Sequence, residues 1–333
     1  MMKKQEKLLK KDILRAKHIL ILTHRGPDLD AFCSMLLLYK ILINLFPKKH
    51  ITMEARQHPQ VKLPQMENIE LVEEIDRGDE DLILCTDSSE WDLFVDEHRD
   101  GVYGSRVKKF FIDHHRSESS EESVINEMRS SATEQVYVTL KRIFDKKFKL
   151  DEDIASLVQY GIVADTGRFL YDLTTPDTFR IFAEVKEFYS VDLEDFTYKY
   201  DKFPQEANEA VIELLKTLTI QDDMAYMYIS RETVQEKGLT KQGVNNGQAF
   251  LRDKYLRFIQ GVHWGFIIKP MFEYTNKWYV SFRSTKGYQD VEIIAKKLNG
   301  GGHKYSSATK VTADTVEEVL EKVLGVVKEV TSS

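Results

Sequence analysis

Apolar residues in the first half of the chain come in short runs that alternate with stretches of helical periodicity. Runs at His18–Thr23, Leu82–Thr86 and residues 107–112 are almost continuously apolar, which is typical of strands buried on both faces. Apolar positions at helical spacing predict helices over residues 30–45 and 151–164. This alternation predicts an α/β fold in which a mainly parallel sheet is covered by helices on both faces.

The pattern changes in the second half of the chain. A polar and aromatic stretch follows residue 189. Beyond it lie a helical stretch, three strand-like stretches and a second helical stretch, at residues 206–218, 224–229, 261–268, 277–282 and 291–298. We therefore expect two domains, residues 1–189 and a smaller α/β domain at residues 213–333, joined by a linker at residues 190–212.

Composition narrows the class of protein. The chain has 333 residues, of which 42% are hydrophobic and 30% charged, so bulk disorder is excluded. With 47 Lys and Arg against 54 Asp and Glu, the net charge is −7, which argues against binding long duplex nucleic acid but not against a small nucleotide. Only Cys33 and Cys85 are present, in apolar surroundings, which excludes a disulfide scaffold and predicts buried, inert thiols.

The sequence shows neither the pattern of a membrane span nor that of a signal peptide. The most apolar stretch, residues 31–46, contains Lys40 and Asn44 and is shorter than the roughly 20 residues that a membrane span needs. The basic N-terminus is not followed by the apolar region of a signal peptide. We expect a cytoplasmic protein without a membrane partner.

Acidic and histidine residues follow the predicted strands at the points where each strand ends. In an open parallel sheet, functional groups gather at the carboxyl ends of the strands. The first strand is followed by His24, Asp28 and Asp30, the second by Asp87, the third by Asp113, His114 and His115, and the helix at 151–164 by Asp165. A lone Asp at a strand end is most often a turn former or helix cap, but four such coincidences favour one shared site.

This set of side chains suits divalent cations. Carboxylates and histidines without thiolates favour manganese first and magnesium next, ahead of iron or zinc. Several carboxylates in one place repel one another unless cations neutralise them, so two ions are expected. A two-metal site typically supports hydrolysis of phosphoesters or phosphoanhydrides.

The order and spacing of these motifs resemble the DHH phosphoesterase family. The second half resembles its DHH-associated C-terminal domain through Arg283-Ser284 and Gly300-Gly301-Gly302-His303. The two-domain length is similar to the nanoRNase branch, which degrades short oligoribonucleotides and dephosphorylates 3′-phosphoadenosine 5′-phosphate (pAp). Departures from the family pattern occur at Cys33-Ser34 and at Ser306-Ser307-Ala308, away from the expected metal ligands.

The resemblance implies a role for each motif residue. His24, Asp28 and Asp87 would bind one manganese ion, while Asp30, Asp87, His114 and Asp165 would bind the other. Asp113 would orient its neighbours from behind the ligands, and His115 would face the scissile phosphate. Substrate would be held by residues of the second domain and one residue beside Asp165: Arg283, Ser284, Gly300, Gly301, Gly302, His303, Lys304 and Arg168.

The resulting expectation is a manganese-dependent phosphodiesterase that hydrolyses short oligoribonucleotides to 5′-mononucleotides, with pAp phosphatase as a second activity. Two alternatives stay open, a phosphodiesterase for linear or cyclic dinucleotides and a nucleotide-binding sensor without turnover. A homodimer is also compatible with the sequence.

Overall fold

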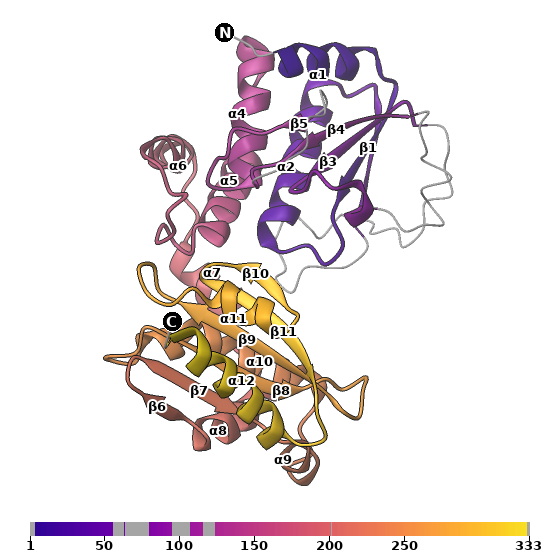
Figure 1. The fold of residues 1–333 in the computed structure, drawn as a ribbon. Coiled ribbons are helices and arrows are strands. Elements are labelled where there is room, and N and C mark those ends of the chain that lie inside the picture. Colours follow the sequence, from indigo (N-terminus) through magenta and orange to yellow (C-terminus); the bar gives the residue numbers. More distant parts are fainter. Residues whose placement is uncertain are drawn as a thin grey trace. The chain divides into compact units, whose positions relative to one another are not determined.

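The computed structural model describes residues 4–55, 63, 80–94, 107–115, 124–200 and 202–331. The chain divides into two compact units, Met1–Asp201 and Lys202–Ser333. Figure 1 labels helices and strands of both units where there is room.

The first unit alternates strands and helices. Its described elements are α1 (Lys4–Arg15), β1 (His18–Thr23), α2 (Leu29–Leu45), β2 (His50–Glu54), β3 (Leu82–Thr86), η2 (Trp91–Leu93), β4 (Lys108–Ile112), β5 (Val124–Ile125), α4 (Ala132–Phe144), η3 (Asp145–Lys147), α5 (Glu152–Asp165), α6 (Pro176–Phe188) and α7 (Leu193–Tyr200).

Five parallel strands form the sheet of this unit, in the order β2-β1-β3-β4-β5. The register pairs Thr23 with Thr86, and Thr86 in turn with Ile112. The last residues of β1, β3 and β4 are therefore neighbours, and the residues that follow them emerge at one edge of the sheet. The predicted α/β fold with a mainly parallel sheet is confirmed.

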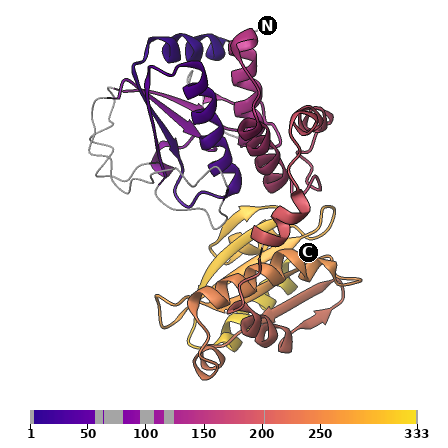
Figure 2. The ribbon, with the colours of Figure 1, turned by 180° about the vertical axis from the view of Figure 1, so that it is seen from behind.

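Helices α1, α2, α4 and α5 contribute to the large core on one face of this sheet, where Phe32, Leu37, Leu140 and Leu157 are fully buried. The view from behind in Figure 2 shows α2 crossing this face. On the opposite face, the described part of the chain contributes η2 and Phe94, which pack on Phe111.

Polar side chains at the helix starts explain where the helices begin. Asp28 accepts a hydrogen bond from the Ala31 N–H (3.0 Å) at the start of α2. Ser131 accepts one from the Glu134 N–H (3.0 Å) at the start of α4, and Asp151 accepts one from the Ile154 N–H (2.8 Å) at the start of α5. Each cap satisfies a backbone donor that the first helical turn leaves without a partner.

The segment predicted as a linker, residues 190–212, is largely helical. Within it, α7 belongs to the first unit, because Phe196 is buried there with its ring 4.4 Å from that of Tyr160. The start of α8 belongs to the second unit, where Ala207 and Ala210 are fully buried. The sequence suggested a linker here because the segment is mostly polar. Helix α7 packs on its unit through only a few apolar residues.

The second unit contains helices on both faces of a mixed sheet. Its elements are α8 (Ala207–Lys216), β6 (Thr219–Gln221), β7 (Met224–Tyr228), α9 (Arg231–Glu236), α10 (Lys241–Lys254), η4 (Leu256–Phe258), β8 (Trp264–Pro270), β9 (Lys277–Ser284), α11 (Val291–Lys297), β10 (Gly301–His303), β11 (Ser306–Thr312) and α12 (Val316–Thr331).

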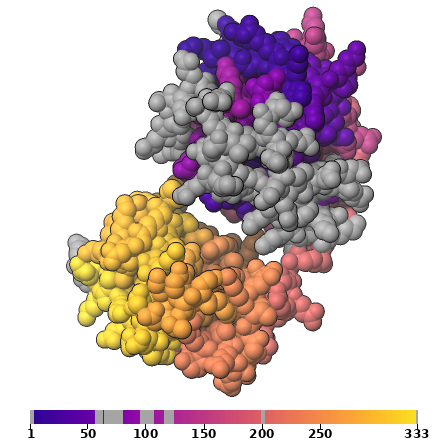
Figure 3. All heavy atoms as spheres, turned by 90° about the vertical axis from the view of Figure 1, so that its right-hand side faces the viewer, coloured from indigo at the N-terminus to yellow at the C-terminus, as the bar shows by residue number. Residues whose placement is uncertain are grey.

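Its six strands are ordered β10-β11-β9-β8-β7-β6, and only β7 and β8 pair in parallel. Side chains along β9 alternate between the two faces of the sheet, and each face carries its own core. On one face, Trp278, Val280 and Phe282 pack with α11 and α12. Helices α8 and α10 contribute to the other core. In Figure 3, yellow atoms from the end of the chain lie beside orange atoms from the earlier part of this unit, as the pairing of β9 with β11 requires.

None of the helices within the described residues combines the length and apolarity that crossing a bilayer needs.

Both cysteines are free and buried, and burial raises the pKa of each thiol above its ordinary value. The prediction of buried, inert thiols is confirmed in this respect.

Candidate metal centre

The residues after β1, β3 and β4 meet at the carboxyl edge of the parallel sheet. His24 follows β1, Asp87 follows β3, and Asp113 leads the Asp113-His114-His115 triplet after β4. Two further carboxylates come from helices, Asp30 from the first turn of α2 and Asp165 from the last residue of α5. The fold thus brings together side chains that lie far apart in the sequence.

Asp87 lies between histidines of different strands. Its Oδ2 is 3.4 Å from His24 Nε2 and its Oδ1 is 3.4 Å from His114 Nε2. Burial opposes ionisation of this carboxyl, but the histidine contacts lower its pKa below the ordinary value. The backbone of Asp87 has φ 66°, a left-handed conformation that Asp and Asn tolerate better than most residues.

His114 is oriented by the backbone behind it. Its Nδ1 lies 3.1 Å from the Arg129 carbonyl oxygen, so Nδ1–H donates there and Nε2 faces the site. Nε2 is also 3.4 Å from Asp165 Oδ2. Burial alone would lower the pKa of His114, but contact with Asp87 and the charges of Asp30 and Asp165 raise it to about 10.

Asp30 is held by another helix. Its carboxylate accepts hydrogen bonds from the backbone N–H groups of Ala132 (2.7 Å) and Thr133 (3.1 Å), at the start of α4. Burial, followed by the charges of Asp87 and Asp165, raises its pKa well above the ordinary value. Asp30 therefore combines a place in the acidic cluster with favourable contacts to a helix N-terminus.

Asp165 completes the cluster from the end of α5. Burial raises its pKa to about 6, helped by the charge of Asp87 and opposed by that of His114. The next residues turn sharply, because Gly167, Arg168 and Phe169 all have positive φ values. Arg168, predicted to contact substrate, lies in the middle of this turn.

Asp28 caps α2 through its side chain, as already described. Its charge nevertheless acts on the cluster, since it contributes to the raised pKa of both His24 and Asp165. For His24 the largest cause is the contact with Asp87.

Asp113 and His115 lie beside the cluster in distinct environments. Asp113 is almost fully buried, and its Oδ1 accepts from the backbone N–H groups of His114 (2.8 Å) and His115 (3.1 Å). The same oxygen lies 3.0 Å from His115 Nδ1, and this contact is the main cause of the raised pKa of His115. The His115 side chain is 60% exposed, so Nε2 of this ring is available to a substrate.

The donor set fits divalent metal ions. Two groups of side chains within the described residues place their donor atoms within 4.8 Å of one another: Asp87, His114 and His115, and Asp30, His114 and Asp165. Asp87 Oδ1 and His114 Nε2 are buried and 3.4 Å apart, and within the described residues neither forms a hydrogen bond. Buried polar atoms without hydrogen bonds are costly, and a cation between them would satisfy both.

The predicted substrate residues of the second unit cluster around the ends of β9, β10 and β11. The register places Arg283 opposite Ser306, which is also opposite His303. Arg283 Nε donates to Asp253 Oδ1 at 3.2 Å, and its Nη1 donates to the Phe282 carbonyl. Ser284 is buried, whereas Lys304 lies in the exposed turn after His303.

Packing accounts for two of the three adjacent glycines. A Cβ at Gly300 would lie 2.3 Å from the Ala308 carbonyl oxygen, and one at Gly302 would lie 2.6 Å from that of Ser306. Gly302 also has φ 136°. Around Gly301, by contrast, a Cβ would meet nothing within 4 Å.

Sequence reasoning missed the residues that support the predicted metal ligands. The Arg129 guanidinium pairs with Glu127 and Glu134 at 2.9 and 2.8 Å, which fixes the backbone whose carbonyl holds His114. The Glu134 carboxylate is itself held by contacts to Arg129, Ser130 and Thr178.

The fold and the site define a class of protein, a two-unit α/β protein with a carboxylate–histidine centre at the edge of a parallel sheet. Residues 18–162 match the model of the DHH family, N-terminal domain. The chain therefore carries a DHH-family domain, which confirms the resemblance seen in the sequence.

Similar proteins extend the comparison over both units. The chain is 26% identical over 322 residues to the bifunctional oligoribonuclease and PAP phosphatase NrnA of Bacillus subtilis, covering 93% of this chain and 95% of the relative. An exopolyphosphatase-related protein from Bacteroides fragilis has the same fold, with a TM-score of 0.80, 22% identity and coverage of 98% and 96%. RecJ of Thermus thermophilus in complex with Mn²⁺ has a TM-score of 0.52 at 14% identity, covering 98% of this chain and 54% of RecJ.

The family match and the similarity to NrnA confirm the predicted class of enzyme, a metal-dependent phosphoesterase.

Proposed function

We propose that this enzyme hydrolyses short oligoribonucleotides to 5′-mononucleotides with two manganese ions at the carboxylate–histidine centre. The observation that carries the proposal is the pair of three-residue donor groups that share His114, together with the buried Asp87 Oδ1 and His114 Nε2, which lie 3.4 Å apart without forming a hydrogen bond. Two adjacent groups that share a member suit two adjacent ions. The name of the B. subtilis relative supports the substrate, and adds pAp as a second one.

The family resemblance assigns His24, Asp28 and Asp87 to one ion, and Asp30, Asp87, His114 and Asp165 to the other. His115 belongs to one of the two donor groups but is assigned to the substrate instead. Bound divalent ions supply a nucleophilic water at neutral pH and stabilise charge on the phosphoryl oxygens. Asp113 fixes the direction of the His115 ring through Nδ1. The exposed Nε2 then holds a proton that can pass to the leaving oxygen or bind a phosphate oxygen.

Substrate binding is assigned in this proposal to Arg168 and to the basic and glycine-rich residues of the second unit. Arg283 is suited to a phosphate because its guanidinium presents several donors in one plane. Gly301 is suited to close approach, because nothing surrounds the position of its missing Cβ. His303 and Lys304 add positive charge or hydrogen-bond donors beside it. A homodimer stays a prediction.

Hydrolysis of RNAs two to five nucleotides long, labelled at the 5′ end, tests the proposal. With Mn²⁺ present we expect complete conversion to mononucleotides, and release of phosphate from pAp. Linear and cyclic dinucleotides in the same panel define the substrate range. Tight nucleotide binding without any turnover would contradict the proposal and identify a nucleotide-binding sensor instead.

A further inference from the structure

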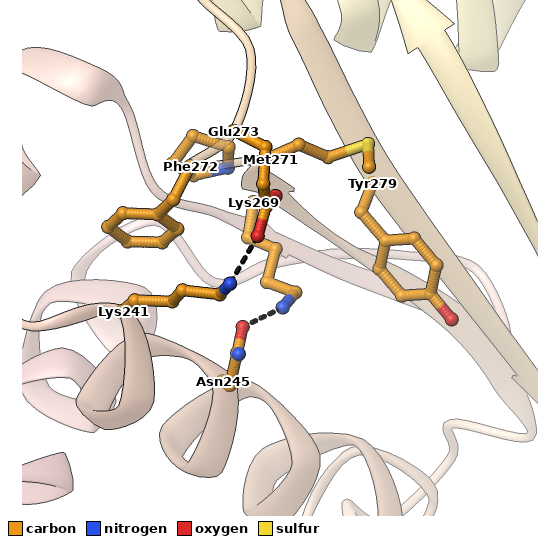
Figure 4. Close-up of a pocket in the computed structure, with 8 residues that line it drawn as sticks. Lys241, Asn245, Lys269, Met271, Phe272, Glu273 and Tyr279 are labelled. Atoms are coloured by element: carbon orange, nitrogen blue, oxygen red, sulfur yellow. Dashed lines mark hydrogen bonds and ion pairs between the residues drawn. The ribbon is translucent and has the colours of Figure 1, made fainter.

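A pocket of about 170 Å³ opens in the second unit, where the turn after β8 approaches the start of α10. Its lining, drawn in Figure 4, consists of Lys241, Asn245, Lys269, Pro270, Met271, Phe272, Glu273 and Tyr279. The register pairs Lys269 with Tyr279, and Gly265 with Arg283. Tyr279, which lines the pocket, is four residues from Arg283 along β9, or about 13 Å. The pocket is therefore separate from the proposed substrate residues.

Lys269 is the central cation of this pocket. Its ammonium group hydrogen-bonds the Asn245 side-chain oxygen and lies 5.4 Å from the centre of the Tyr279 ring. Within the described part of the chain, no carboxylate comes within ion-pair distance of it. Burial, with the positive charge of Arg252 added, lowers the pKa of Lys269 to about 8. Lys269 is only partly buried, but cations withdrawn from water are normally paired with anions, so this one lacks a usual partner.

Lys241 provides a second cation that a ligand can recruit. It pairs with Glu273, and both side chains of this pair are more than half exposed. Exposed ion pairs contribute little to stability, so an anion of higher charge can compete with Glu273 for Lys241. Figure 4 shows the Lys241–Glu273 and Lys269–Asn245 contacts on neighbouring side chains, with Phe272 and Met271 beside them.

We propose that this pocket binds a small phosphate-class anion, either inorganic phosphate or the phosphate group of a small molecule. Lys269 and Lys241 supply the charge, and the Asn245 amide can turn to donate a hydrogen bond. A dianion matches two ammonium groups better than a carboxylate does. Met271 and Phe272 line the same pocket and present apolar surface beside these charges.

Acetylation rates of individual lysines test the proposal on the full wild-type chain without divalent metal. Acetic anhydride reacts with neutral amines, and mass spectrometry reports each lysine separately. Phosphate should slow acetylation of Lys269 by the factor 1 + [L]/Kd, about tenfold at ten times the Kd. Lys328 is exposed on α12, which packs on the other face of the sheet, and should not respond.

Control conditions distinguish a site from simple screening. Sodium chloride at matched ionic strength should leave Lys269 unprotected, and equal protection by both salts would overturn the proposal. So would an unchanged Lys269 rate up to about 50 mM phosphate, well above a millimolar Kd. Comparing inorganic phosphate with AMP distinguishes the two sources, because AMP carries the phosphate group of a small molecule and should protect Lys269. Adenosine lacks the phosphate group. Protection by adenosine equal to that by AMP would contradict an anion site.

A substitution gives an independent readout. Lys269→Met keeps the apolar stem and removes the charge, so phosphate should no longer slow acetylation of Lys241. The matched variant Lys328→Met should retain the effect of phosphate on Lys241. Neither variant touches the metal centre, and RNA hydrolysis should be unchanged in both. Because these measurements omit divalent metal, their failure is distinguishable from failure of the proposed hydrolysis.

Discussion

At the scale of single residues, Asp87 shows how backbone conformation restricts the choice of side chain. Its left-handed φ of 66° disfavours branched residues, and its two oxygens contact the histidines that follow β1 and β4. The strand-end position predicted a carboxylate in the site. It did not predict the backbone conformation, which depends on the sheet edge rather than on local sequence.

Asp87→Asn separates charge from shape at this position. Asn tolerates the same backbone conformation, so the fold should persist while a negative ligand is lost. We expect Mn²⁺ affinity and the rate of RNA hydrolysis to fall by more than about 100-fold. This loss is larger than the loss expected when a residue that only supports a metal ligand is removed. Calorimetric Mn²⁺ titration and the labelled-RNA assay measure the two losses. The control Asp92→Asn changes an exposed carboxylate on η2 and should behave as wild type.

A second prediction concerns pH. Burial would raise the pKa of Asp253, but Arg252 and Arg283 lower it below the ordinary value. A carboxyl with a lowered folded-state pKa stabilises the fold above its unfolded pKa, about 3.9, and loses that effect as pH falls through the folded value. Urea unfolding at pH 5 and pH 3 should show a smaller acid-induced loss in Asp253→Asn than in wild type. Equal losses would show that this carboxyl is not stabilised by the arginines.

At the scale of elements, α2, α4 and α5 approach one another closely around the metal centre. A Cβ at Gly161 on α5 would lie 2.2 Å from Thr133 Oγ1 and 2.9 Å from Asp30 Oδ1. Glycine at this position therefore lets α5 pack against the start of α4 and against a predicted metal ligand.

Gly161→Ala should displace both Thr133 and Asp30. We expect a loss of about 1–3 kcal/mol in the free energy of unfolding, together with weaker Mn²⁺ binding. Gly325→Ala is the matched control, because nothing lies within 4 Å of that Cβ on α12 and helix propensity should add up to about 1 kcal/mol. Chemical denaturation compares the two. Unchanged stability and Mn²⁺ binding in Gly161→Ala would mean that the helices can move apart freely.

Elements with strong periodicity were predictable from the sequence, and short ones were not. The helix at 151–164 and the strands at 18–23 and 82–86 match the structure closely, because each carries a continuous apolar pattern. Helix α7 was interpreted as linker because few apolar residues anchor it, Phe196 buried and Leu193 partly buried. The contact between Asp30 and α4 could not be predicted from the sequence either, because it joins residues about 100 positions apart.

At the scale of the whole molecule, each unit has its own buried cores, and the predicted metal ligands all belong to the first. Metal binding should therefore stabilise one unit selectively. At a Mn²⁺ concentration of 100 Kd, the gain is about 2.7 kcal/mol, or about 5–10 °C for a unit of this size. Calorimetry should show a rise in the first unit's transition.

Hydrogen exchange provides the control for this prediction within the same protein. Protection should increase in α2 and α4, which carry or contact the predicted ligands, and stay constant in β8 and β9. A uniform increase in both units would contradict selective stabilisation.

The burial of both thiols has a practical consequence. Cys33 and Cys85 have raised pKa values and no solvent access, so maleimide dyes should leave them unmodified in the folded protein. Cysteines introduced at exposed positions, such as Lys147→Cys on η3 and Lys328→Cys on α12, would then be the reactive pair. A donor and an acceptor dye placed there would report the distance between the two units by energy transfer while an oligonucleotide binds. The native chain thus needs no cysteine removal before single-molecule measurements.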